Sequence, residues 1–234
     1  MGKIGYGYGS EWHLLRYLGY HRAYFSDLIL SRIGGQSLSW HDFRFLPPNR
    51  SNKHDGEHIG LDFLENVEAE AAWRSFWPQS GNAHNWDAVG EIWVNGQREW
   101  LLVEAKAHSG EIKSSCGASS QKSLSMIRAA LSQTMASFCE TPVPVERWMS
   151  PYYQYANRLA MLHFLMKVCD PPIPARLLFI YFTGDRRPDG SICPQTSTDW
   201  EPDITAMEHH LGIDKDSELY SRVHQVILPV NPEQ

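Results

Sequence analysis

The stretch NWDAVGEIWVNGQREWLLVEAKAH, residues 85–108, decides the fold predicted for this chain. Residues 86–94 and 98–107 are rich in Trp, Val, Ile and Leu, which is typical of β-strands. Between them lies Asn95-Gly96, a strong hairpin signal, because a two-residue type I′ turn needs positive φ at both central positions. The stretch therefore predicts two antiparallel strands joined by this turn.

The turn sets the register of the hairpin and places Asp87 directly opposite Glu104. Because side chains alternate along a strand, Lys106 joins these two carboxylates on one face. Leu102 continues the same face toward the turn. The other face of the second strand carries only small or apolar side chains, namely Leu101, Val103, Ala105 and Ala107. We therefore expect the second strand to be covered on both sides.

Two carboxylates roughly 5 Å apart on one face repel each other and need a compensating partner. A hard divalent cation such as Mg²⁺ supplies it, because Mg²⁺ binds one or two carboxylates together with phosphate and water. The alternative is an ordinary ion-pair cluster of Asp87, Glu104 and Lys106 at an exposed strand end. The bare spacing is common by chance, but the apolar flanks and the fixed register favour a metal site.

Asp87, followed by a strand ending in Glu104-Ala105-Lys106, resembles the D…(D/E)xK signature of the PD-(D/E)XK (restriction-endonuclease-like) nuclease superfamily. Trp86 stands where the superfamily's name has Pro. The resemblance covers residues 61–184. It implies an α/β fold with a mixed sheet and an αβββαβ core, extended here by extra N-terminal and C-terminal helices.

The resemblance also implies Mg²⁺- or Mn²⁺-dependent hydrolysis of nucleic-acid phosphodiester bonds. Asp87 and Glu104, with the backbone carbonyl of Ala105, would bind the metal, which would polarise the phosphate and activate a water. Lys106 would orient that water or stabilise the charge that develops on the phosphate. We expect DNA rather than RNA as the substrate.

The superfamily often carries another acidic metal-site residue on its first core helix, which we expect over residues 61–73. At about 100° per residue, Glu68 falls inside the apolar stripe of that helix and Glu65 at its edge. We therefore assign Glu68 to the site, with Glu65 second. The alternative is that Glu68 pairs with a buried Arg or snorkels to solvent. A short first strand is predicted to follow over residues 72–77.

A helix over residues 151–168 is apolar on nearly all sides, so we expect it to be deeply packed. Gln154 and Arg158 lie along one line at its polar end. They could point at the metal site or at a phosphate, or they could hydrogen-bond a neighbouring loop. The helix faintly resembles the Gln-x-x-x-Tyr helix of some superfamily nucleases, with Arg158 in place of Tyr.

Two loops carry further candidates. The Ser/Gly-rich loop after the hairpin contains Lys113 and Lys122 and is long enough to be a mobile substrate-contact loop. The polar loop before residue 61 contains His54 and His58, which lack a known ligand spacing. We therefore treat the two lysines as candidate nucleic-acid contacts and give the histidines little weight.

The remaining pattern predicts a helix over residues 10–33, a short strand over 40–46 and a helix over 121–138. A buried strand is expected over 177–183 and completes the core sheet. Two C-terminal helices, over 200–211 and 217–223, and a last strand over 225–230 follow. We expect one nuclease-like domain over 1–234, with a core at 61–184 between extensions at 1–60 and 185–234.

The composition argues against several classes of protein. The chain has 234 residues, 42% of them hydrophobic, with no apolar run long enough for a membrane span and no signal-peptide pattern. Its 4 cysteines are widely spaced, which favours reduced thiols and a cytoplasmic protein. The net charge of −6 argues mildly against a partner with many phosphates, although acidic metal ligands contribute to it.

Two rival functions remain open at this stage. The fold could serve a catalytically silent nucleic-acid-binding module, or a protein-interaction domain whose acidic cluster is a surface feature. The sequence also leaves a monomer and a homodimer open.

Overall fold

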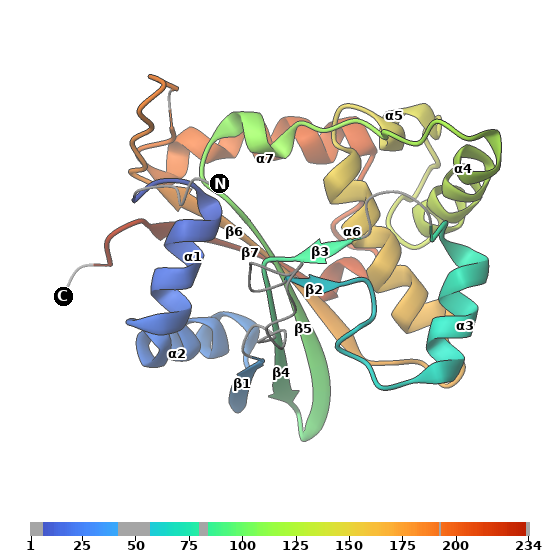
Figure 1. Cartoon of the computed structure of the whole chain (residues 1–234), viewed down its shortest axis with the longest axis horizontal. Helices are drawn as coiled ribbons and strands as arrows, with labels where there is room; N and C mark the ends of the chain where they lie inside the picture. Colours follow the sequence, from blue (N-terminus) through green and yellow to red (C-terminus); the bar gives the residue numbers. More distant parts are fainter. Residues whose placement is uncertain (1–6, 42–56, 80–83, 192, 233–234) are drawn as a thin grey trace, which may run out of the picture.

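The computed structural model describes residues 7–41, 57–79, 84–191 and 193–232. A five-stranded mixed sheet with the order β1-β4-β5-β6-β7 forms its centre (Figure 1). The strands are Ser37–His41 (β1), Ala88–Val94 (β4), Gln97–Lys106 (β5), Ala175–Thr183 (β6) and Val223–Pro229 (β7). β1, β4 and β5 pair antiparallel, whereas β5, β6 and β7 pair parallel. The chain therefore has the mixed α/β fold that the sequence predicts.

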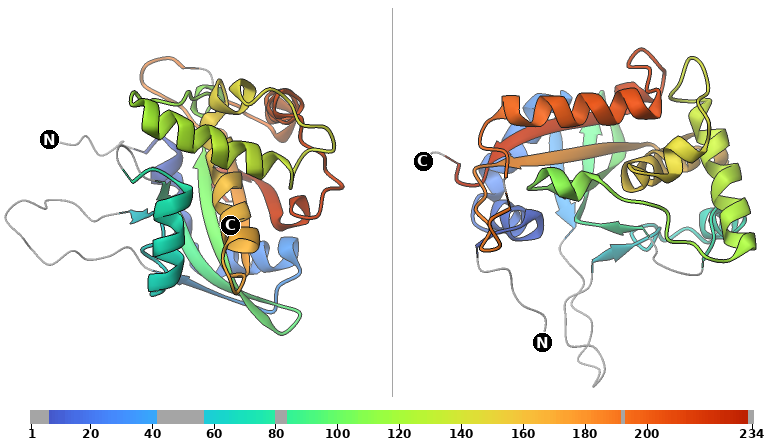
Figure 2. Two further views of the ribbon diagram at one scale, coloured as in Figure 1. Left: turned by 90° about the vertical axis from the view of Figure 1, so that its right-hand side faces the viewer. Right: turned by 90° about the horizontal axis from the view of Figure 1, so that it is seen from above.

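Helices cover both faces of this sheet (Figures 1 and 2). One face packs against α1 (Ser10–Gly19) and α2 (Arg22–Ile33). The opposite face packs against α4 (Gln121–Met135), α6 (Tyr153–His163) and α7 (Ser197–Leu211). The shorter helices α3 (Val67–Phe76) and α5 (Glu146–Met149) flank this second layer. None of the helices in the described part of the chain is long and apolar enough to cross a membrane.

The hairpin at the centre of the sheet is confirmed. Asn95 has φ 51° and Gly96 has φ 76°, so both turn residues adopt the left-handed backbone that a type I′ turn requires. β4 and β5 pair in the predicted register, with Trp93 opposite Arg98 and Val94 opposite Gln97. The choice of turn therefore controls which side chains share a face.

β5 is covered on both faces, as predicted. Leu102 packs into the core beneath α4, α6 and α7. The neighbouring Leu101 and the alternate residues up to Ala107 pack into the other core, beneath α1 and α2. Hydrogen bonds to β4 on one edge and β6 on the other complete its surroundings. Polar side chains at the end of this strand are consequently held in place from several sides.

The helix predicted over residues 61–73 is confirmed only from Val67 onward, and the strand predicted over 72–77 is wrong. Residues 61–63 form a turn, and the helix begins only at Val67 and continues through Phe76, where a strand was expected. The side chain of Asn66 accepts a hydrogen bond from the backbone N–H of Ala69 and caps the helix at 2.9 Å. The late start changes the buried face, which now consists of Ala69, Trp73 and Phe76.

The first strand of the main sheet lies earlier in the chain than expected. β1 pairs with β4 over its whole length, so a segment predicted to lie outside the core supplies an edge of the sheet. The expected helix over residues 10–33 is divided at Tyr20 and His21 and ends at Gly34, whose φ is 75°. Residues 42–46 of the expected strand and His54 lie outside the described residues.

Between β1 and β4 the chain forms α3 and a separate two-stranded sheet of β2 (His58–Ile59) and β3 (Asn85–Trp86). Toward the C-terminus β6, α7 and β7 lie close to their predicted ranges. The helix expected over 217–223 is wrong, because only a short 3₁₀ turn, Tyr220–Arg222, forms there. β7 joins β6, so the sheet extends beyond the predicted core.

Candidate active site

The polar cluster lies at the carboxyl end of β5. The backbone N–H of Asp87 donates to the carbonyl of Val103 at 3.1 Å, which continues the β4–β5 pairing by one residue. The side chain of Asp87 in turn accepts a hydrogen bond from the backbone N–H of Ala105 at 2.7 Å. Asp87 is thereby fixed beside Glu104, as the predicted register requires.

Glu104 is surrounded by donors. Lys106 and the side-chain amide of Gln154, at 2.7 Å, both donate to its Oε1. Arg158 donates to Oε2 from Nε at 2.9 Å and forms an ion pair through Nη2 at 2.8 Å. The Glu104 and Arg158 side chains are each only 4% exposed, so this is a buried ion pair with every carboxylate oxygen satisfied.

Further contacts fix the side chain of Arg158, which α6 carries. Nη2 of Arg158 donates to the carbonyl of Asn85 at 2.6 Å, and Nη1 donates to Oδ1 of Asn157 at 2.8 Å. The guanidinium also lies over the ring of Trp86, 4.8 Å from its centroid. One arginine therefore connects α6, β3 and the end of β5.

Gln154, one turn earlier on α6, bridges the cluster. Its amide oxygen accepts from Lys106 Nζ at 3.0 Å while its amide nitrogen donates to Glu104. Both polar residues predicted at the start of this helix therefore reach the carboxylate site. The sequence signal was a polar line at one end of an otherwise apolar helix, and the hydrogen bonds to Glu104 distinguish this interpretation from the loop alternative.

The two carboxylates have opposite electrostatic environments. Burial, reinforced by the charge of Glu104, raises the pKa of Asp87 to about 7, although Lys106 partly offsets this. Burial alone would also raise the pKa of Glu104. The nearby charges of Arg158 and Lys106 outweigh it and hold the pKa of Glu104 below its ordinary value. Asp87 is therefore the carboxylate that lacks sufficient positive charge.

The predicted role of Glu68 as a member of a buried stripe is wrong. Glu68 and Glu65 are both exposed, and Glu68 occupies the first turn of α3, where a carboxylate favours the helix dipole. The helix was predicted to begin at residue 61, but residues 61–66 lie before it, and the face that packs carries Ala69, Trp73 and Phe76 and leaves Glu68 exposed. The structure does not bring Glu68 into the cluster around Glu104.

A cleft of about 680 Å³ opens beside the cluster. Gln154 and Arg158 form one wall, and the segment that contains Ser114 forms another. This segment is anchored, because Ser114 pairs with Tyr152 and its hydroxyl accepts from the backbone of Gln154 at 2.7 Å. Lys113 and Lys122 are exposed and do not line the cleft.

His84 is a buried residue of this region that the sequence did not single out. Its Nε2 hydrogen-bonds the carbonyl of Asn157 at 3.0 Å, and its ring packs against Trp73, Trp77 and Trp86. Burial, with a smaller contribution from Arg158, lowers the pKa of His84 to about 3, so the ring is neutral. A single His in a Trp-rich stretch gives no sequence signal for this environment. His58 is also buried, in β2 rather than in a loop, with Nδ1 3.5 Å from Asp62.

The donor set at the end of β5 fits a hard divalent cation. Asp87 and Glu104 share one face and offer the oxygen donors that such a cation prefers, and burial together with the charge of Glu104 raises the pKa of Asp87. Within the described ranges, no group of three or more His, Cys, Asp and Glu side chains is arranged to hold a metal. A cation here would therefore rely on two carboxylates, a backbone carbonyl and external ligands such as water and phosphate.

Comparison with known proteins gives no relative from which a function could be transferred. No family model matches the chain, and neither a curated protein nor a solved structure matches it significantly. The function must therefore be inferred from the residues of the chain itself.

Proposed function

We propose that the protein is a metal-dependent nuclease that hydrolyses phosphodiester bonds, with its active site at the carboxyl end of β5. The observation that carries this proposal is the convergence of Asp87, Glu104 and Lys106 on one face of a strand end. A carboxylate pair beside a lysine is the arrangement that phosphodiester hydrolysis with a divalent cation needs.

Asp87 and Glu104, together with the carbonyl of Ala105, would hold Mg²⁺ or Mn²⁺. When bound, the cation would act as a Lewis acid toward the phosphate and make a nearby water more acidic. Lys106 would donate a hydrogen bond to the negatively charged phosphate oxygens. Gln154 holds the Lys106 ammonium at 3.0 Å, so the donor is already oriented.

The order of elements along the chain supports the same proposal. Helix α2 is followed by the antiparallel strands β1, β4 and β5, then by the helices α4, α5 and α6 and the parallel strand β6. If α3 and the small β2–β3 sheet are counted as an insertion after β1, this order supports an αβββαβ core of the kind that the resemblance implies, beginning at α2 instead of at the predicted helix over 61–73.

The test is cleavage of labelled DNA and RNA oligonucleotides with Mg²⁺, with Mn²⁺ and with EDTA. We expect cutting that depends on the metal and is lost in Asp87→Asn and Lys106→Ala. Matched controls are Asp216→Asn and Lys167→Ala, which change exposed residues outside the cluster and should cut normally. Circular dichroism establishes that each variant folds. Cutting that persists in EDTA or in folded Lys106→Ala would overturn the proposal.

The second candidate is a catalytically silent module that binds nucleic acid or a protein. One observation favours it: Lys106 and Arg158 both pair with Glu104, so this carboxylate is already compensated without a cation. The melting temperature with added Mg²⁺ separates the two candidates. A rise in the wild type that is absent in Asp87→Asn supports the nuclease, and no rise together with no cutting supports the silent module.

A further inference from the structure

The cleft beside the active site has walls of a distinctive composition. Hydroxyl and amide side chains predominate among its polar residues, which include Asn85, Ser114, Ser115, Gln154 and Asn157. Apolar and aromatic walls come from Trp77, Pro78 and Tyr153. Arg158 is the charged side chain among the lining residues that the structure describes, and its guanidinium is engaged by Glu104, Asn85 and Asn157.

Such walls suit bases and sugars better than a row of phosphates. A duplex presents its phosphates outward, and a protein that grips it supplies many Lys and Arg side chains. The net charge of this chain is −6, and the cleft offers neutral hydrogen-bonding groups instead. Unpaired nucleotides expose base edges and ring faces, which amide, hydroxyl and aromatic side chains recognise.

The active site is also recessed. The side chains of Glu104 and Lys106 are 4% and 11% exposed. A duplex is stiff over about 150 base pairs and meets a protein with its outer surface. A flexible single strand can instead enter a narrow cavity, and a volume of about 680 Å³ falls in the range of sites that enclose small ligands. The cleft therefore has room for one or two nucleotides and not for a length of double helix.

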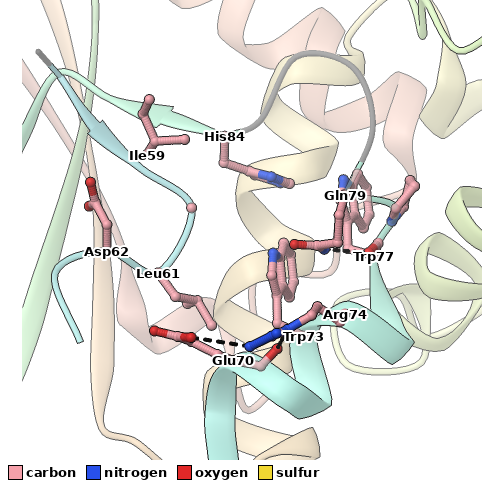
Figure 3. A pocket seen from close by; sticks show the side chains of 11 residues that line it. Ile59, Leu61, Asp62, Glu70, Trp73, Arg74, Trp77, Gln79 and His84 are labelled. Atoms are coloured by element: carbon pink, nitrogen blue, oxygen red, sulfur yellow. Dashed lines mark hydrogen bonds and ion pairs between the residues drawn. The ribbon is translucent and has the colours of Figure 1, made fainter. Parts of the chain in front are cut away.

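A second cavity of about 420 Å³ borders the first, because Trp77, Pro78 and His84 line both. Trp77 and His84 are seen at this second cavity in Figure 3. Trp73 and Trp77 are parallel within 4°, with ring centroids 5.8 Å apart. Arg74, which pairs with Glu70 at 3.2 Å, lies at this second cavity (Figure 3). Aromatic lining is therefore found in the second cavity as well as in the cleft.

We infer that the substrate is a single-stranded nucleic acid whose unpaired nucleotides occupy this cleft. Their bases would lie against Tyr153 and Pro78. The adjoining phosphodiester would extend past Gln154, which lines the cleft, toward Lys106, which donates to Gln154. This inference rests on the proposed nuclease function, since it assigns the substrate class of that same site. Tyr153 is the residue to test because it is only half-buried and directly precedes Gln154 on α6.

The experiment compares single-stranded DNA, single-stranded RNA and duplex DNA of one sequence, by cleavage in Mg²⁺ and by fluorescence anisotropy in EDTA. We expect cutting and binding of a single strand, with the duplex intact. Tyr153→Ala should weaken binding and kcat/KM for the single strand about tenfold, mainly through KM, because a stacking surface is lost. Tyr153→Phe should restore both. Tyr20→Ala, which changes a side chain that is 84% exposed, is the control.

The outcomes separate this inference from the proposed function. If the duplex is cut as fast as the single strand, or if Tyr153→Ala matches the wild type, the inference fails and the nuclease stands. If nothing is cut but a single strand binds and Tyr153→Ala weakens that binding, the nuclease fails and the cleft assignment stands. If nothing is cut and no single strand binds, both fail. Comparison of single-stranded RNA with single-stranded DNA shows whether the cleft accepts ribose, deoxyribose or both.

Discussion

At the scale of single residues, the Glu104–Arg158 pair is costly to desolvate and is held in one geometry by several hydrogen bonds. Two charges, each on a side chain that is 4% exposed, have lost most of their hydration, and the pair offsets this only through close contacts. Arg158 does so with bonds to Glu104, to Asn85 and to Asn157. Removal of one partner leaves the other charged, buried and poorly compensated.

We predict that Arg158→Met lowers the free energy of unfolding by about 3–5 kcal/mol. The double variant Glu104→Gln with Arg158→Met should lose less than Arg158→Met alone, because it removes the uncompensated charge as well. Urea unfolding followed by circular dichroism measures both. Arg74→Met is the control, since its pair with Glu70 is about half exposed and should contribute at most about 1 kcal/mol. A double variant less stable than Arg158→Met would contradict this account.

His84 predicts a pH dependence. Its pKa is about 3 in the folded protein and near 6.5 when unfolded, so the unfolded chain binds a proton first as pH falls. The stability that neutral His84 contributes is therefore complete above about pH 6.5 and is lost progressively toward pH 3. We expect the difference in melting temperature between wild type and His84→Gln to be smaller at pH 5 than at pH 7.5. A difference that stays constant over this range would show that His84 titrates normally.

At the scale of elements, the type I′ turn is the local structure on which the site depends. A shift of register by one residue would move Glu104 and Lys106 to the opposite face, toward the core beneath α1 and α2. Asn95 and Gly96, with φ of 51° and 76°, prevent that shift because few other residues adopt both conformations.

We predict that Gly96→Ala lowers the free energy of unfolding by about 1 kcal/mol, because an L side chain is strained at this φ. The added Cβ itself meets no atom within 4 Å, so the cost is conformational rather than steric crowding by neighbours. Gly19→Ala is the control: it lies at the end of α1, has no positive φ, and should be neutral or slightly stabilising. Urea midpoints for the two variants provide the test. Equal midpoints would argue against the strained turn.

α3 illustrates how a few residues decide the environment of a side chain. A start at residue 61 would bury Glu68, whereas the actual start after the Asn66 cap exposes it and buries Trp73. Glu68 therefore lies on the exposed face of α3 and not on its buried face. Helix boundaries are set by caps and by the contacts of the preceding turn, and periodicity alone locates them poorly.

At the scale of the whole molecule, one sheet separates two hydrophobic cores. Leu101 and Leu102 are adjacent on β5 and both fully buried, yet Leu101 faces the core beneath α1 and α2 and Leu102 faces the other. Because the same strand anchors both cores, neither can come apart without disturbing the other. Unfolding should therefore be cooperative.

We predict that Leu101→Ala and Leu102→Ala each cost about 2–5 kcal/mol. In each variant, Trp fluorescence and far-ultraviolet circular dichroism should report a single shared transition in urea. The expected reason is that a cavity on either face weakens the same sheet. Transitions that separate in one variant only would show that the two cores unfold independently, and would contradict the shared-strand interpretation.

The sequence by itself determined the hairpin, its register and the convergence of Asp87, Glu104 and Lys106. These depend on local rules, since a turn and the alternation of side chains suffice to place them. The buried strand β6 and the polar start of α6 could also be predicted from the sequence, because the pattern for each lies within one segment. Nuclease activity and the metal remain predictions.

Only the tertiary structure decided that Arg158 and Gln154 bind Glu104, that β1 joins the sheet as its edge, and that Glu68 lies in solvent. Each of these depends on pairing between segments far apart in the chain. Such pairings are chosen by the packing of two cores around one sheet, and no pattern within a single segment records them. The cleft also depends on the tertiary structure, because its walls come from separate elements that must pack together.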